Sequence, residues 1–192
     1  MFKKTILPAL LLFIISSVTI YAGKGPGDKI EDFTLKSVDG ASYSLSNVKD
    51  SKALVIMFWS TECPNVQPYT GRLNEMTKEY SGKGITFWAV NSNSTESYDD
   101  VKAHIKAHNY AFPELKDDNN KLADQLGATR TPEVYVINSD NVIVYHGRID
   151  NNRDASKVTS NDLKNALDEL LAGKEVTVKT TKTFGCTIKR AD

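Results

Sequence analysis

The sequence predicts an α/β domain of three layers, in which helices cover both faces of a mixed β-sheet. Three observations carry this prediction. Segments of strand character alternate along the chain with segments of helical periodicity. Ala53 to Trp59 is an unbroken run of seven apolar residues, which is typical of a strand buried on both faces. Near the end, the strands Glu133–Ile137 and Val142–His146 flank the tight polar turn Asn138–Asn141 and precede a last helix.

The elements around the central apolar run follow from local patterns. Asp32–Leu35 and Ser42–Leu45 alternate apolar with polar residues on either side of Asp39-Gly40, which predicts an N-terminal β-hairpin. After the central run, apolar residues recur at helical spacing from Tyr69 to Tyr80. Pro68 and Gly71 lie inside the helix expected after the central run, which predicts either a kink or a late start of the regular helix.

The second half of the chain continues the alternation of strands and helices. The expected elements are a buried strand over Ile85–Val90, a helix over Ser97–Asn109, a short helix over Asn119–Leu126 ended by Gly127, a last helix with an apolar stripe from Leu163 to Leu171, and a polar, β-prone tail from about Glu175.

The first 22 residues have the layout of a secretory signal peptide. Lys3 and Lys4 precede an apolar run from Ile6 to Ile20, and Ala22 is a small residue suited to cleavage. An uncleaved membrane anchor is the alternative, although the run is short for a bilayer span. We therefore expect a signal peptide over residues 1–22 and one domain over residues 23–192, exported to the periplasm or outside the cell.

The composition of the mature chain does not favour binding to nucleic acid or to a membrane. Without Lys3 and Lys4, 22 basic residues stand against 24 acidic ones, a net charge of 22 − 24 = −2. No basic cluster suggests binding to nucleic acid or, after cleavage of the signal peptide, to a membrane. Two cysteines remain, Cys63 and Cys186, and in an exported protein they permit one disulfide.

Cys63 is the candidate nucleophile. It follows the central strand and a short turn, where the N-terminal end of the next helix would stabilise a thiolate. Pro64 fits the first turn of such a helix, because that position has no N–H bond to lose. Glu62 acts in the opposite direction, since a neighbouring carboxylate raises the pKa of a thiol.

Thr131-Pro132 stands directly before a predicted strand. A cis bond at this place would turn the chain sharply and leave the preceding backbone free to pair with an extended peptide. The local sequence alone favours an ordinary trans proline at a strand start.

Several motifs together resemble the thioredoxin superfamily. FWSTECP is similar to the segment that carries that family's nucleophilic cysteine, and GATRTPEVYVIN to its cis-proline loop and following strand. The phrases AVNSN, FPELKD, YHGRIDN and FGCTIK resemble its exported, peroxiredoxin-like branch, which is related to alkyl hydroperoxide reductases and thiol-specific antioxidants. The resemblance implies a thioredoxin-like fold with an N-terminal hairpin extension, and a cis bond before Pro132.

The chain also departs from the patterns of this superfamily. Val66 and Gln67 stand where thioredoxins and copper-chaperone relatives place a second cysteine, so dithiol exchange within the helix is excluded. Ser60 fills the hydroxyl position of the peroxiredoxin motif, but Ile56 replaces its proline.

The resemblance implies an exported thiol-dependent oxidoreductase. Cys63 would attack a peroxide or a protein disulfide, with Ser60, Thr131 and the helix N-terminus orienting it and Arg130 helping to hold it ionised. The cis Pro132 belongs to the same site. Cys186 is the candidate resolving cysteine, from the same chain or from the neighbour in a homodimer. Because no flavin or nicotinamide motif is present, no cofactor is expected, and a thioredoxin-like reductant protein would supply the electrons.

Two alternatives stay open. One is a non-catalytic module that binds peptides in the cis-proline groove and keeps Cys63 and Cys186 in a stable disulfide. The other is a metal carrier that uses Cys63 with His104 or His108, which sit four residues apart on one predicted helix. Without a third ligand, a solvated helix face is the better interpretation of the two histidines, and no metal site is expected.

Overall fold

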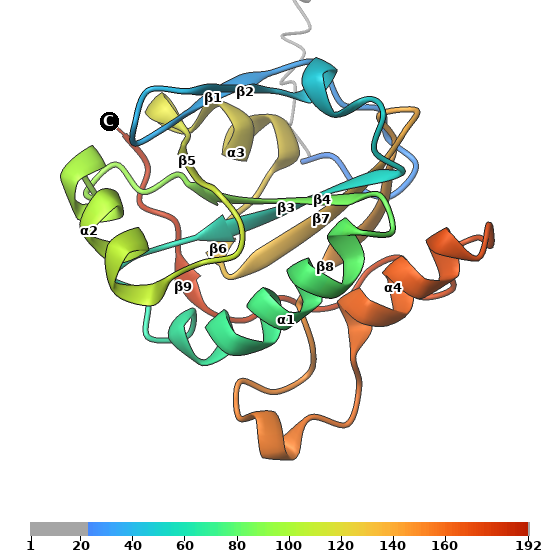
Figure 1. Cartoon of the computed structure of the whole chain (residues 1–192). Coiled ribbons are helices and arrows are strands. Elements are labelled where there is room, and N and C mark those ends of the chain that lie inside the picture. The colour runs from blue at the N-terminus through green and yellow to red at the C-terminus, as the bar shows by residue number, and fades with distance from the viewer. Residues whose placement is uncertain (1–22, 192) are drawn as a thin grey trace, which may run out of the picture.

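The computed structural model of the chain describes residues 23–191, and strand β3 (Ala53–Trp59) lies inside its main sheet, with a strand on either side (Figure 1). All seven residues of β3 are buried, as the apolar run predicts. Alternate side chains enter two separate core clusters, with Val55 and Met57 in one and Ile56 and Phe58 in the other. The predicted signal peptide lies outside the described residues. None of the helices over residues 23–191 is long and apolar enough to cross a membrane.

The sheet is mixed, as predicted. β3 runs parallel to β4 (Ile85–Asn91) and antiparallel to β7 (Glu133–Asn138). The full order of the seven strands is β2-β1-β5-β4-β3-β7-β8. The remaining strands are β1 (Thr34–Ser37) and β2 (Ser42–Ser44) of the predicted hairpin, β5 (Glu114–Lys116), and β8 (Ile143–Gly147).

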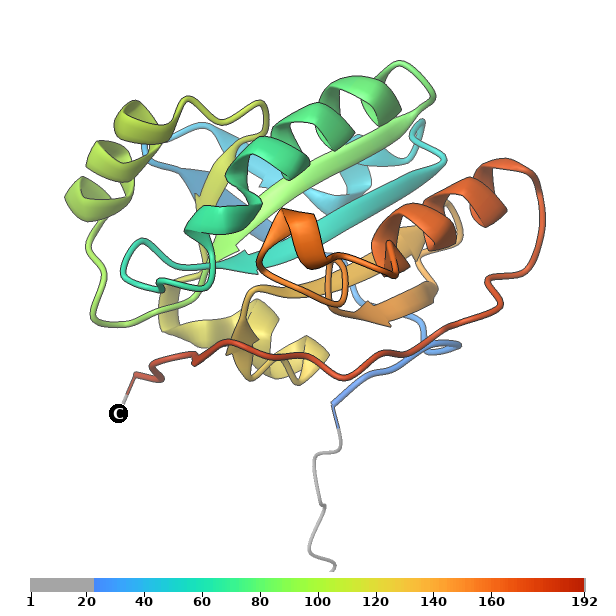
Figure 2. The same ribbon diagram turned by 90° about the horizontal axis from the view of Figure 1, so that it is seen from below.

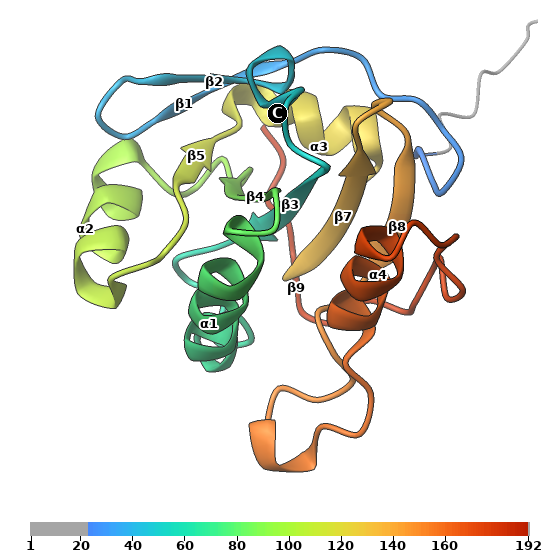
Figure 3. The same cartoon turned by 45° about the vertical axis from the view of Figure 1, so that its right-hand side comes forward.

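Helices form the two outer layers (Figure 3). α1 (Thr70–Ser81) and α4 (Asp162–Leu171) cover one face of the sheet, and α3 (Lys121–Leu126) covers the other. α2 (Tyr98–His108) packs beside β5. The two core clusters lie between these layers, so the three-layer α/β prediction is confirmed.

Local signals set the ends of the helices. Ser97 and Asp100 form a reciprocal capping box at the start of α2, and Asn109 ends the helix with a φ of 49°. The regular part of α1 starts late, which is one of the two expected outcomes, because a 3-10 turn over Gln67–Tyr69 precedes it.

The C-terminal tail returns across the molecule as an extended segment (Figure 2). It first pairs with the edge strand β8, where the amide of His146 donates to the carbonyl of Lys179 over 2.9 Å. It then forms β9 (Cys186–Thr187), which pairs antiparallel with β6 (Arg130–Thr131) in a second, two-stranded sheet. This pairing brings the end of the chain to the loop that precedes Pro132.

Candidate active site

Cys63 lies in the loop that leaves the C-terminal end of β3, and its side chain is only 2 % exposed. The expectation that Cys63 starts a helix is wrong in detail. Cys63 is followed by a turn in which the Val66 amide donates a 3.0 Å hydrogen bond to the Cys63 carbonyl, and α1 begins only at Thr70. Pro64 lies in this turn rather than in the first turn of a helix. A turn and the 3-10 segment Gln67–Tyr69 therefore separate Cys63 from the start of the regular helix.

The two cysteines of the chain form a disulfide. Cys63 bonds to Cys186 of the same chain, with 6.0 Å between their Cα atoms and a sequence separation of 123. Cys186 sits on β9 and is partly exposed, in contrast to Cys63. The sequence left open whether Cys186 pairs with Cys63 of the same chain or of a neighbouring subunit, and in the structure the pair lies within one chain.

The Thr131–Pro132 bond is cis and lies against both sulfur-bearing residues. The Cys63 Sγ is 3.2 Å from the Thr131 carbonyl oxygen, which can accept a hydrogen bond from the S–H group of the reduced thiol. Thr131 is also the strand partner of Cys186 in the β6–β9 register. Thr131 therefore contacts the site through its backbone. Its hydroxyl is buried and has no hydrogen-bond partner over residues 23–191.

Ser60 is connected to the Cys63 loop through Glu96 and not through a hydrogen bond to Cys63 itself. Its hydroxyl donates a 2.6 Å hydrogen bond to Glu96, which is 3 % exposed. Glu96 also accepts bonds from the amide (2.7 Å) and the hydroxyl (2.6 Å) of Thr61. Ser60 and Thr61 thus fasten the loop before Cys63 to a buried carboxylate.

The pKa of Glu96 is shifted by two opposing effects. Burial raises the pKa, but the hydrogen bonds from Ser60, Thr61 and Asn91 outweigh it, so the net pKa lies below the ordinary value. Glu96 is consequently ionised at neutral pH.

A wider polar network supports Glu96, and the sequence analysis did not find it. The side-chain amides of Asn91 (2.7 Å) and Asn93 (2.8 Å) donate to the Glu96 carboxylate. Lys116 is buried and donates to the Glu96 carbonyl over 2.7 Å. The only signal in the sequence was the run of polar residues directly after β4, at the end of the sheet where the Cys63 loop also begins.

Arg130 does not point at Cys63, contrary to the sequence-based expectation. Its side chain is exposed, and its guanidinium donates a 3.3 Å bond to the Gly185 carbonyl in the tail. The alternation of side chains along β6 explains this direction, because Thr131 is the residue buried toward the core. Arg130 therefore holds the tail beside Cys186 rather than the thiolate of Cys63.

A third segment reaches the disulfide from the side of α1. The Asn65 amide nitrogen lies 3.6 Å from the Cys186 Sγ, and Arg153 donates to the Asn65 amide oxygen over 3.3 Å. Arg153 belongs to the loop between β8 and α4, which is orange in Figure 1 and projects past α1. Arg72 of α1 fastens this loop through an ion pair with Asp150.

The sequence suggested that His104 lies on a solvated helix face, and this prediction is wrong. It is 8 % exposed, lies 3.3 Å from Glu114 of β5, and contacts the Gln67 side chain over 2.7 Å. Burial raises the pKa of Glu114. No group of three or more His, Cys, Asp or Glu side chains that could hold a metal ion occurs over residues 23–191.

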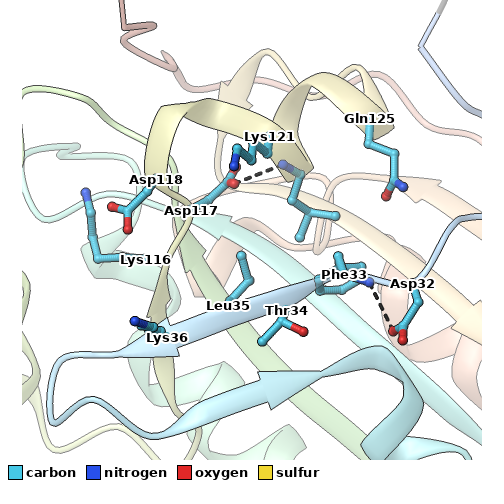
Figure 4. A pocket seen from close by; sticks show the side chains of 11 residues that line it. Asp32, Phe33, Thr34, Leu35, Lys36, Lys116, Asp117, Asp118, Lys121 and Gln125 are labelled. Carbon is cyan, nitrogen blue, oxygen red and sulfur yellow. Dashed lines mark hydrogen bonds between the residues drawn. The ribbon is translucent and has the colours of Figure 1, made fainter.

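A groove of about 390 Å³ lies on the other side of the sheet, between β1 and α3 (Figure 4). Its lining includes Lys36, Lys121 and Asp117, and the Asp117 carboxylate accepts the amide of Leu122 at the start of α3 over 2.9 Å. Neither cysteine lines this groove, so the groove is separate from the disulfide.

Comparison with known proteins connects the fold and the site to two groups of thiol proteins. Thioredoxin-like protein YneN of Bacillus subtilis is 31 % identical over 118 residues, 61 % of this chain and 68 % of that protein. Thiol-disulfide oxidoreductase ResA of Oceanobacillus iheyensis is 29 % identical over 58 % of each chain. Chloroplastic peroxiredoxin Q of Populus jackii is 25 % identical over 65 % of this chain and 61 % of that protein. The chain thus spans less than two thirds of the latter two relatives.

Solved structures agree on the fold. A hypothetical protein, SMc02350 of Sinorhizobium meliloti, matches with a TM-score of 0.81 and 34 % identity over 88 % of this chain and 97 % of that one. Peroxidoxin BcpB of Mycobacterium tuberculosis matches with a TM-score of 0.56 and 19 % identity over 77 % of this chain and 94 % of that one. The chain has a thioredoxin-like fold. Residues 26–146, more than half of the sequence, match the profile of the AhpC/TSA family, and the chain therefore belongs to the AhpC/TSA family.

Proposed function

We propose that this redoxin is an exported, thiol-dependent peroxidase that uses Cys63 as the nucleophile and Cys186 as the resolving cysteine. The observation that carries the proposal is the disulfide between these two residues, placed against the backbone of the cis-proline loop. A relative named peroxiredoxin Q supports peroxide as the oxidant, and one named thiol-disulfide oxidoreductase supports exchange with thiols.

The oxidative half of the proposed reaction consumes one peroxide. The Cys63 thiolate attacks one peroxide oxygen and breaks the O–O bond, which gives a Cys63 sulfenic acid and, after protonation, an alcohol or water. The Cys186 thiol then attacks the sulfenic sulfur, so that the disulfide forms and water leaves. Two electrons pass from the cysteine pair to the peroxide. Glu96 holds the loop that carries Cys63, through Ser60 and Thr61.

The reductive half needs an external dithiol, for which we propose a thioredoxin-like protein. Cys186 is the partly exposed sulfur, so the reductant thiolate attacks Cys186 and releases Cys63 as a thiolate. The second thiol of the reductant then breaks the mixed disulfide and releases Cys186. The reductant leaves as a disulfide, and its two electrons have passed to the Cys63–Cys186 pair, which is again a dithiol.

Export is part of the proposal and rests on two sequence features. Residues 1–22 have the layout of a signal peptide, and a disulfide between the two cysteines suits an oxidising compartment. The mature chain would then be one domain over residues 23–192.

Intact mass measurement tests the proposal. The reduced mature protein receives one equivalent of hydrogen peroxide without added thiol. We expect rapid loss of two hydrogens, and each cysteine serves as the control for the other. Cys63→Ser should show no change in mass, whereas Cys186→Ser should gain one oxygen at Cys63.

An unchanged mass after prolonged exposure would contradict the peroxidase proposal. A further measurement then separates the alternatives. A disulfide that a thioredoxin-like protein reduces readily would point to thiol-disulfide exchange. One that resists this reductant in the folded protein would be a structural link in a binding module.

A further inference from the structure

The tail of the chain occupies the strand edge at which a thioredoxin-like protein could hold an extended peptide. We infer that residues 185–191 form a built-in strand that keeps protein substrates off the cis-proline loop and so reserves the thiol pair for small peroxides. This inference rests on the proposed function, because both need Cys63 as the nucleophile. It adds to that function the class of oxidant that the site excludes, namely protein disulfides.

The covered edge is the backbone of β6. Extended peptides commonly bind proteins by adding a strand to an exposed edge, with main-chain hydrogen bonds supplying the affinity. In the part of the chain that the structure describes, β6 pairs with β9 and with no other strand. The register places Thr131 opposite Cys186 and Arg130 opposite Thr187. The tail therefore lies where an incoming peptide with its own cysteine opposite Cys63 would have to lie.

The fit between the tail and the loop depends on a glycine. Gly185 has a φ of +146°, and a Cβ atom added there would overlap the carbonyl oxygen of Thr131. The guanidinium of Arg130 reaches across to the Gly185 carbonyl over 3.3 Å. Close backbone contact of this kind leaves no room for a second strand at the same edge.

Other contacts hold the tail independently of the disulfide. Ile188 is 3 % exposed and belongs to the core cluster on the α3 side of the sheet. Polar contacts continue along the residues after it. They join the Ile188 amide to Thr129 (3.0 Å), the Lys189 amide to Asn93 (2.8 Å), the Arg190 side chain to Ala128 (2.6 Å) and Asp124 (2.9 Å), and the Ala191 amide to Asn120 (2.8 Å).

These contacts do not require the Cys63–Cys186 bond, so the edge stays covered when the pair is reduced. A small peroxide needs only to reach the Cys63 sulfur, whereas a protein disulfide needs the edge of β6 as well. The apparent affinity for such a substrate falls in proportion to the fraction of molecules in which the tail has left the edge. The tail thus selects between two classes of oxidant.

Variants that undock the tail test the inference while keeping both cysteines. Ile188→Asp removes the apolar anchor, and Gly185→Val introduces a side chain that overlaps Thr131. Val178→Asp is the matched control, because Val178 lies in the same tail and is 54 % exposed. Two rates are measured for each protein with dithiothreitol as the electron donor, namely consumption of hydrogen peroxide and reduction of insulin disulfides.

We expect the wild-type protein and Val178→Asp to consume peroxide and to accelerate insulin reduction only weakly. Ile188→Asp and Gly185→Val should reduce insulin about tenfold faster or more, in line with the larger fraction of open molecules. Folded variants with an unchanged insulin rate would overturn the inference, as would a wild-type protein that already reduces insulin at the rate of the variants. Should wild-type protein consume no peroxide while the undocked variants gain insulin reduction, the peroxidase proposal falls together with the reservation for peroxides, and only the exclusion of protein substrates by the tail stands.

Hydrogen exchange on the unmodified protein gives a test that does not depend on the folding of variants. The Ile188 amide donates to the Thr129 carbonyl, so its exchange reports whether the tail is docked. Slow exchange of this amide in both the oxidised and the reduced protein is expected. Fast exchange in the reduced protein alone would mean that reduction opens the edge, and the inference would then be wrong.

Discussion

The two cysteines of the disulfide are held by different kinds of interaction. The loop before Cys63 is fastened by hydrogen bonds from Ser60 and Thr61 to a buried carboxylate, that of Glu96. The segment around Cys186 is held by strand pairing and by the burial of Ile188. Hydrogen bonds to a carboxylate depend on pH and constrain the direction of the donor closely. Apolar burial does not depend on pH and is not directional. The nucleophile is therefore expected to be the more rigidly placed of the two sulfurs, and the tail the part that can be loosened separately.

The largest effect should come from breaking the support of the Cys63 loop. Glu96→Ala leaves several buried donors without an acceptor, and each costs about 1 to 3 kcal/mol. We expect the free energy of unfolding to fall by about 3 to 5 kcal/mol, measured by denaturant titration of the oxidised protein.

The control for this variant is Glu62→Gln, because Glu62 is exposed and lies in the same loop. Its unfolding free energy should change by less than about 0.5 kcal/mol. A loss below about 1 kcal/mol for Glu96→Ala would show that the carboxylate is not what fixes the loop.

A smaller effect is expected on the tail. Ile188→Ala removes buried methyl groups at the edge of a core cluster and should destabilise the reduced protein by about 2 kcal/mol. Unfolding of the reduced protein in denaturant measures this loss, and Val178→Ala, on the exposed part of the tail, should cause almost none. Equal losses for the two variants would mean that the tail is not anchored at Ile188.

The smallest effect, and the one that separates the two regions most cleanly, is the response to acid. The pKa of Glu96 is lower in the folded protein than in the unfolded chain, so its contribution to stability is complete above the ordinary glutamate pKa of 4.5 and is lost as the pH falls through the folded pKa. Unfolding free energy measured from pH 7 downward should decline more for the wild-type protein than for Glu96→Gln. Parallel curves for the two proteins would contradict the assigned role of the carboxylate, and Ile188→Ala should leave the shape of the curve unchanged.

The main strands and helices could be predicted from the sequence because their signals are local. The apolar run of β3, the capping residues of α2 and the turn between β7 and β8 all act within a few residues of themselves. β5, β6 and β9 were not predicted as separate strands, because each has only two or three residues and pairs with a strand distant in sequence. The equally short β2 was predictable because a local turn joins it to β1.

The cysteines of the site could be predicted from the sequence, but the contacts of the residues around them could not. Cys63, Cys186 and the cis bond at Pro132 are where the motifs indicated, and their chemical roles remain predictions. The partner of Ser60 was not predicted and the direction of Arg130 was wrong, because each depends on a residue far away in sequence. Ser60 meets Glu96 36 residues later, and Arg130 meets Gly185 55 residues later. No local pattern carries information over such distances.

The position of the disulfide has a topological consequence for proteolysis. Because Cys63 and Cys186 are 123 positions apart in the sequence, the bond closes a covalent ring that includes everything from α1 to the beginning of β9. The exposed residues around Arg153, in the projecting loop, lie inside this ring. A single cut there leaves the oxidised protein in one covalent piece, whereas the same cut in the reduced protein yields two fragments held together only by packing. The oxidation state thus decides whether damage to the loop divides the molecule.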